Sequence, residues 1–118
     1  MYSLIAGKYL EKTEVISVIQ IYFHNVSVSW LNINCSNTAD ILLEQEELTG
    51  DFNITLNVYT NIEMDIKELA LFCSTKWCTE LIISNNEMNP YTWIMVSPNG
   101  SIKNVSQIPT DDGRFLIL

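Results

Sequence analysis

Basic residues are scarce in this chain, and their scarcity argues against one large class of functions. Of its 118 residues, six are Lys or Arg and fourteen are Asp or Glu, which gives a formal net charge of −8. Proteins that bind DNA or RNA neutralise rows of phosphates with clustered Lys and Arg side chains. Six basic residues spread along an acidic chain do not form such a cluster, so we expect no direct contact with nucleic acid.

Groups that carry catalysis are equally few. His24 is the only histidine, and the four glycines are scattered at turns without forming a phosphate-binding loop. A zinc site would need His24 together with all three cysteines, which lack recognisable ligand spacing. Acidic pairs such as Asp111 with Asp112 are better explained by a solvated acidic surface. We therefore expect neither an enzyme nor a metal or cofactor site.

The cysteines and the hydrophobic runs point to an intracellular compartment. Cys35, Cys73 and Cys78 are odd in number and form no CxxC pair, so we expect small buried apolar residues, although a disulfide between two would leave the third free. No apolar run approaches the roughly 18 residues of a membrane span. The first residues lack the basic region of a signal sequence, and a cytosolic location is the simplest expectation.

Hydrophobic residues make up 47% of the sequence, which predicts one folded domain over residues 1–118. Its most regular stretch runs from Val15 to Cys35, where apolar residues occupy odd positions up to Phe23 and even positions from Val26. A hairpin with a turn at His24-Asn25 places both sets on one face. The alternative is one long strand with a bulge at the same point.

The next segments differ in how clearly they can be interpreted. Residues 1–13 fit an edge strand or a short helix, and residues 39–48 fit a helix by propensity but are favoured as a strand that frays into an acidic loop. Residues 52–58 alternate strictly and predict a half-buried antiparallel partner for that strand. Apolar spacing then predicts one principal amphipathic helix near residues 62–76, begun by Asp65 with Glu68 as a variant capping box.

Strands return in the last third of the chain. We expect strands at 80–84, 91–97 and 102–108, with a reversal at Pro98-Asn99-Gly100-Ser101, because Asn-Gly readily adopts a type I′ turn. Pro109 should end the third of these, and 114–118 supplies a last short strand or a docked tail. The predicted class is α+β, with a mostly antiparallel sheet of about six to eight strands and the helix on its apolar face.

The acidic residues are unevenly distributed. Between Lys12 and Lys67 there is no basic residue, whereas this interval holds eight acids; outside it, acids and bases balance. The negative electrostatic field of such an acidic segment speeds the encounter with a basic protein and repels acidic competitors. Tyr59 or Tyr22 could add an aromatic anchor. The candidate partner-binding residues are Asp40, Glu44, Glu46, Glu47, Asp51, Tyr59, Glu63 and Asp65.

In size, in its pI near 4.3, in the antiparallel α+β interpretation and in its lack of catalytic residues, the chain resembles bacterial immunity proteins. These are cytosolic antidotes that neutralise nuclease toxins delivered by neighbouring cells. The resemblance implies a basic partner, most simply a nuclease toxin domain, whose phosphate-binding surface would be covered by the acidic residues.

Two other functional classes remain open. A virus-encoded decoy that mimics the charge of nucleic acid would have the same acidic character. A secreted or viral surface glycoprotein is suggested by five Asn-x-Ser/Thr sequons, at Asn25, Asn34, Asn53, Asn99 and Asn104. In a cytosolic chain these asparagines are interpreted as residues of turns and strand faces.

Overall fold

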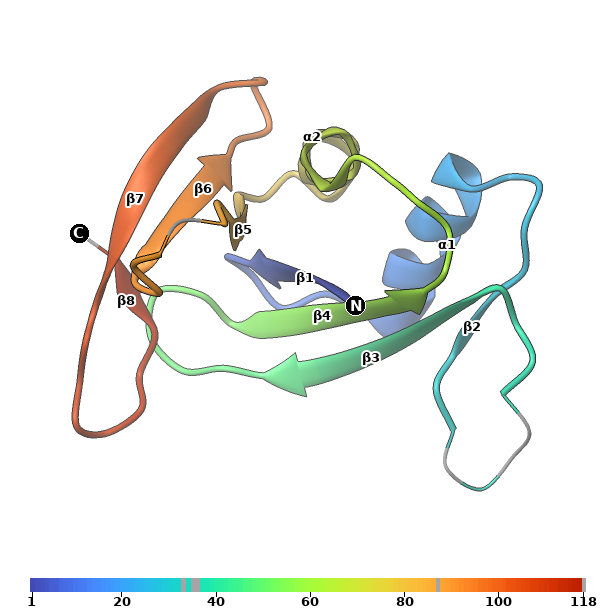
Figure 1. The fold of residues 1–118 in the computed structure, drawn as a ribbon, viewed down its shortest axis with the longest axis horizontal. Helices are drawn as coiled ribbons and strands as arrows, with labels where there is room; N and C mark the ends of the chain where they lie inside the picture. Colours follow the sequence, from blue (N-terminus) through green and yellow to red (C-terminus); the bar gives the residue numbers. More distant parts are fainter. Residues whose placement is uncertain (33, 35–36, 87, 118) are drawn as a thin grey trace.

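The computed structural model describes residues 1–32, 34, 37–86 and 88–117, which form a curved sheet with two helices (Figure 1). Its elements are β1 (Tyr2–Ala6), α1 (Lys12–Tyr22), β2 (Val28–Trp30), β3 (Ile41–Glu47), β4 (Ile54–Thr60), α2 (Ile66–Trp77), β5 (Leu81–Ser84), β6 (Thr92–Val96), β7 (Ile102–Ile108) and β8 (Leu116–Ile117). None of the helices in these residues is long and apolar enough to cross a membrane.

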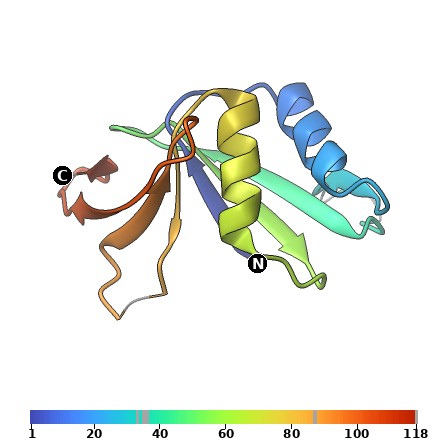
Figure 2. The ribbon, with the colours of Figure 1, turned by 90° about the horizontal axis from the view of Figure 1, so that it is seen from above.

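The eight strands lie in the order β2-β3-β4-β1-β5-β6-β7-β8. All neighbouring pairs are antiparallel except β2 with β3, which run parallel. The two helices lie side by side on one face of the sheet (Figure 2), where Tyr22 of α1 contacts Phe72 of α2 with ring centroids 5.2 Å apart. The predicted α+β class with a mostly antiparallel sheet is confirmed.

Alternation along the strands divides the apolar residues between two cores. In β1, Leu4 and Ala6 pack with the helices, whereas Ile5 points to the other face. The helix-side core is the larger and includes the fully buried Trp77. A second core covers one end of the opposite face, and it consists of Ile5, Phe52, Ile82, Met95, Val105 and Phe115.

The predicted hairpin over residues 15–35 is wrong, as is the alternative of one bulged strand. Lys12–Tyr22 forms α1, because Val15, Val18 and Ile19 recur at helical spacing and are buried. Ile21, which the hairpin required on its apolar face, is 59% exposed. β2 begins only at Val28 and pairs in parallel with β3. His24 is exposed, as expected, but it follows the helix instead of forming a hairpin tip.

The prediction of α2 is confirmed, with a start later than residue 62. Asp65 is its N-cap, and its Oδ1 accepts hydrogen bonds from the backbone N–H groups of Lys67 at 3.0 Å and Glu68 at 3.4 Å. The helix ends at Trp77, and the C-cap residue Cys78 has a left-handed backbone.

The cysteine prediction is confirmed for Cys73 and wrong for Cys78. Cys73 is free and lies in the core, where burial raises the pKa of its thiol. Cys78 is also free but exposed. Cys35 lies outside the described residues.

The remaining segments settle several open alternatives. Residues 1–13 contain a strand, but β1 occupies the middle of the sheet between β4 and β5 and is not an edge. β3 is the predicted partner of β4. The β6–β7 hairpin is present, but its turn is not type I′, which needs positive φ at both central residues: φ is +89° at Gly100 and negative at Asn99. Residues 116–117 form β8.

Candidate functional site

The helices cover one face of β3, β4 and β1, and polar side chains occupy the other. Paired residues share a face, so Leu43 with Val58 lies in the helix-side core while the flanking pair Glu44 with Asn57 points away from it. We call this second surface the open sheet face. It comprises Ser3, Leu42, Glu44, Glu46, Thr55, Asn57 and Tyr59.

A chain of hydrogen bonds crosses the open sheet face from β1 to β3. The Ser3 hydroxyl donates to Asn57 Oδ1 at 2.8 Å, and Asn57 Nδ2 donates to Glu44 Oε1 at 3.1 Å. The Tyr59 hydroxyl donates to the same Glu44 oxygen at 2.9 Å. Asn57 is only 7% exposed and Glu44 is half-buried. The Glu44 carboxylate is thus held in one position by two neutral donors.

No cation compensates this charge among the residues that the structure describes. The carboxylate of Glu44 raises the pKa of Tyr59, first by accepting its hydrogen bond, then with partial desolvation and with the charges of Glu44 and Glu46. Glu46 lies on the same surface as Glu44, because it is two residues further along β3 and pairs with Thr55.

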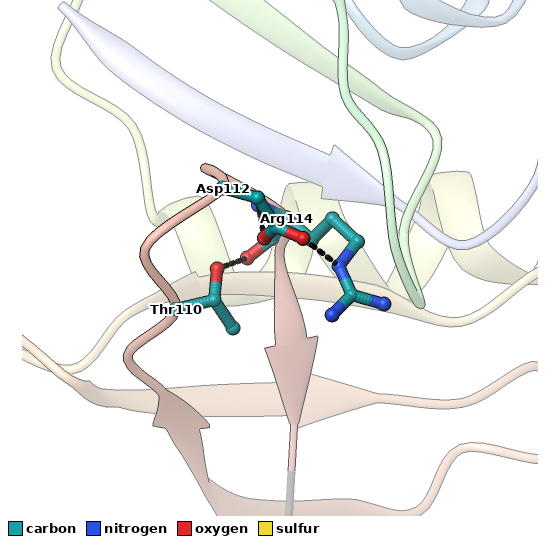
Figure 3. A network of polar contacts seen from close by, with 3 residues as sticks. All are labelled: Thr110, Asp112 and Arg114. Carbon is teal, nitrogen blue, oxygen red and sulfur yellow. Dashed lines mark hydrogen bonds and ion pairs between the residues drawn. The ribbon is translucent and has the colours of Figure 1, made fainter.

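The single salt bridge of the described residues lies in the electrically balanced part of the chain. Arg114 Nε donates to Asp112 Oδ2 at 2.7 Å, in the turn between β7 and β8 that the Thr110 hydroxyl closes by donating to the Arg114 carbonyl (Figure 3). The backbone N–H of Arg114 first, and then the Thr110 hydroxyl and the guanidinium, lower the pKa of Asp112. The candidate acids therefore form no ion pair within the described residues.

A shallow hollow of about 360 Å³ adjoins Tyr59, and its lining includes Met1, Asp40 and Leu42. Asp40, just before β3, is bonded to Ser27, just before β2, because its Oδ2 accepts the backbone N–H and the hydroxyl of Ser27, both at 3.1 Å. It remains exposed. Asp40 is therefore a structural residue whose negative charge borders the open sheet face.

The other candidates lie elsewhere. Glu47 pairs with Ile54 and belongs to the opposite face at the end of β3. Asp51 accepts the backbone N–H of Ile117 at 2.9 Å, which fastens β8 to the loop after β3. Asp65 caps α2, and Glu63 is exposed in the connection before it. The structure thus brings together Glu44, Glu46 and Tyr59, with Asp40 at their margin, and disperses the remaining four.

Sequence reasoning missed two members of the network. The alternation of residues 52–58 predicted that Asn57 meets water, but its side chain is only 7% exposed and bonds to Ser3 and Glu44. Ser3 lies 54 positions from Asn57 in the chain, in a segment whose structure was left open. Within the described residues, no group of three or more His, Cys, Asp or Glu side chains is arranged to hold a metal ion.

Comparisons with protein-family models, with curated proteins and with solved structures found no match to this chain.

Proposed function

We propose that this chain is a small acidic inhibitor that binds and blocks a strongly basic protein, most simply as a cytosolic immunity protein that neutralises a nuclease toxin. The observation that carries the proposal is the Glu44 carboxylate, which is fixed by Asn57 and Tyr59 and faces no cation among the described residues. It lies on the one sheet face that the helices leave uncovered.

A carboxylate held in this way is prepared for a Lys or Arg side chain from outside. Its position is set before binding, so that less conformational entropy is lost when a guanidinium or ammonium group contacts it. Glu46 and Asp40 extend the negative field along the same side and would steer a basic partner toward it. A nuclease carries Lys and Arg where it binds phosphates, and this is the complementary surface.

The arrangement narrows the set of residues that we expect to contribute to affinity. Asp51 and Asp65 accept backbone hydrogen bonds, so their first role is in the fold. Glu47 and Glu63 add to the general field. We assign the direct contacts to Glu44 and Glu46, with Tyr59 as the aromatic anchor beside them.

The test uses the protein encoded beside the gene for this chain, which the proposal expects to be a nuclease, and it measures binding by calorimetry and inhibition by nuclease assay. A one-to-one complex without nuclease activity is expected. The double variant Glu44→Gln with Glu46→Gln should lose about 2 to 3 kcal/mol of binding free energy, which is a weakening of roughly 30- to 150-fold. The matched control is Glu14→Gln with Glu68→Gln, which changes the net charge equally at two exposed positions on the helices that cover the other side of the sheet.

Two results would contradict the proposal. One is equal affinity of the site variant and the control variant for the nuclease. The other is an affinity that does not fall when salt rises from about 50 mM to about 500 mM, since exposed charge pairs are screened over this range. A decoy that mimics nucleic acid would instead compete with DNA for several basic proteins.

A second candidate function, that of a secreted or viral surface glycoprotein, is favoured by one observation. The asparagines of all five sequons are exposed: Asn25, Asn34, Asn53, Asn99 and Asn104. Glycan attachment needs accessible asparagines. A mass shift after glycosidase treatment of native material would support this function, and an unmodified mass would eliminate it.

A further inference from the structure

The outer edge of β3 is paired over only part of its length. Ile41 N–H donates to the Ser27 carbonyl at 3.0 Å, and the Leu43 carbonyl accepts from Leu31 N–H at 2.8 Å. β2 pairs with β3 only as far as Leu43. In Figure 1, the half of β3 nearest its arrowhead forms the margin of the sheet.

Alternation shows which backbone groups this leaves unpaired. Residues 41 and 43 bond outward to β2, so residues 45 and 47 direct their N–H and C=O groups to the same edge. No described residue hydrogen-bonds the backbone groups of Gln45 or Glu47 there. The backbone groups of Glu44 and Glu46 point the other way, toward β4. The open edge is therefore the outward side of residues 44–47.

We propose that an extended basic segment of the partner adds to this open edge as the next strand of the sheet. This inference rests on the proposed function and specifies how the partner is recognised. The backbone of the added strand would bond Gln45 and Glu47, and its side chains that share the face of Glu44 and Glu46 would carry Lys or Arg. Affinity then comes from the backbone and selectivity from the charge.

Charge complementarity selects this occupant over a second copy of the chain. If two β3 edges paired in antiparallel fashion with the two Gln45 residues opposite each other, Glu44 of each copy would lie opposite Glu46 of the other, and like charges directly opposite each other are destabilising. The acids thus protect the edge from self-association while leaving it attractive to a cationic strand.

The other unpaired edges of the described sheet lack this property, and the terminal strands β2 and β8 contain no acid. β8 pairs with β7 only at Gln107 and Ile108, so the outer side of residues 102–106 also has no strand beside it. That stretch contains no acid and one base, Lys103. Acidic residues on an unpaired edge are therefore particular to β3 within the described sheet, which is why we place the basic segment there.

The first arm of the test varies the probe. A short blocked peptide in which lysine and threonine alternate is compared with a twin that is methylated at every peptide nitrogen, so that it keeps the charges but cannot donate backbone hydrogen bonds. The unmethylated peptide should bind at least about tenfold more tightly, and it should slow amide hydrogen exchange at Gln45 and Glu47. Equal binding of both peptides would overturn strand addition.

The second arm varies the protein. Gln45→Pro removes an outward N–H that the sheet does not use, and proline is tolerated at such edge positions. Gln45→Ala keeps the N–H but loses the same side-chain bond from Nε2 to the Leu10 carbonyl at 3.3 Å. The proline variant should bind the peptide about tenfold more weakly than the alanine variant, whereas equal binding refutes the inference. If the proline variant does not fold, the peptide pair decides alone.

Failure of this inference is distinguishable from failure of the proposed function. If the nuclease binds the Glu44→Gln with Glu46→Gln variant as tightly as it binds the unaltered chain, the proposed function is wrong. If that variant loses the nuclease while Gln45→Pro and Gln45→Ala retain it equally, only strand addition is wrong and the partner docks on the open sheet face alone.

Discussion

Gly50, in the loop after β3, forms a parallel bridge with Phe115 just before β8, and replacing it should separate the two segments. The backbone φ at Gly50 is +112°, and a Cβ there would clash with the carbonyl oxygen of Phe115. Two hydrogen bonds hold the bridge: Asp51 N–H donates to the Phe115 carbonyl at 2.7 Å, and Phe115 N–H donates to the Thr49 carbonyl at 2.6 Å. Gly50→Ala therefore cannot be accommodated without moving the backbone.

The magnitude follows from these contacts. The positive φ costs about 1 to 3 kcal/mol for a residue with a side chain. Weakening the two backbone hydrogen bonds adds about 1 kcal/mol each. The sum is about 3 to 5 kcal/mol, a large part of the 5 to 15 kcal/mol that is typical of folded domains. With an unfolding entropy of about 2.1 cal/mol/K per residue, the melting temperature should fall by about 12 to 20 °C.

Thermal and urea unfolding followed by circular dichroism measure this change. Gly113→Ala is the matched control, because Gly113 also has a positive φ, +77°, but no described residue other than its two chain neighbours has an atom within 4 Å of a Cβ placed there. It should lower the free energy of unfolding by only about 1 kcal/mol. If the free energies of unfolding of Gly50→Ala and Gly113→Ala differ by less than about 1 kcal/mol, the inference that Phe115 leaves no room for a side chain at Gly50 is wrong.

Two further predictions concern Tyr59 and Asp65. The hydrogen bond to Glu44 raises the pKa of Tyr59 in the folded chain. This hydrogen bond therefore stabilises the fold fully below the ordinary tyrosine pKa of about 10, and the stabilisation is lost as pH rises through the pKa that Tyr59 has in the folded chain. An NMR titration of ring-labelled tyrosine should give a lower Tyr59 pKa in Glu44→Gln, and an unchanged pKa would contradict the network. Asp65→Ala should lower the free energy of unfolding by about 1 kcal/mol through loss of the N-cap of α2. The exposed neighbour Glu63 is the control, and equal effects of Asp65→Ala and Glu63→Ala in urea unfolding would count against the cap.

The contrast between α1 and α2 shows what the sequence could predict. In α2 the helical spacing is unambiguous and Asp65 supplies a start signal, so type and position were predictable. Around α1, Ile19, Ile21 and Phe23 fit period two while Val15, Val18 and Ile19 fit a helix, and the many β-branched residues favour a strand. Residues 12–22 form a helix instead of a strand because the helix buries its apolar side against α2 and the helix-side core. Local propensity does not contain this tertiary information.

The candidate site was predictable in composition but not in geometry. The cation-free interval drew attention to Glu44 and Glu46, but the sequence analysis treated all the acids of that interval as one surface. Because side chains alternate along β3, Glu47 lies on the opposite face from Glu44 and Glu46. The Asp51 carboxylate already accepts a hydrogen bond from the backbone N–H of Ile117. These separations depend on register and on contacts between distant segments, which charge counting cannot supply.

Two gaps in the architecture coincide at the acidic part of β3. On the face away from the helices, the second core covers the sheet around Ile5 and Ile82, but it stops short of Glu44. At the edge, β2 covers Ile41 to Leu43 and also stops short of Glu44. A half-buried carboxylate with neutral donors alone is less stable than one beside a cation. A single cationic strand laid along residues 44–47 would complete the ladder and neutralise the acids together, which is why we treat the uncovered face and the unpaired edge as parts of one binding surface.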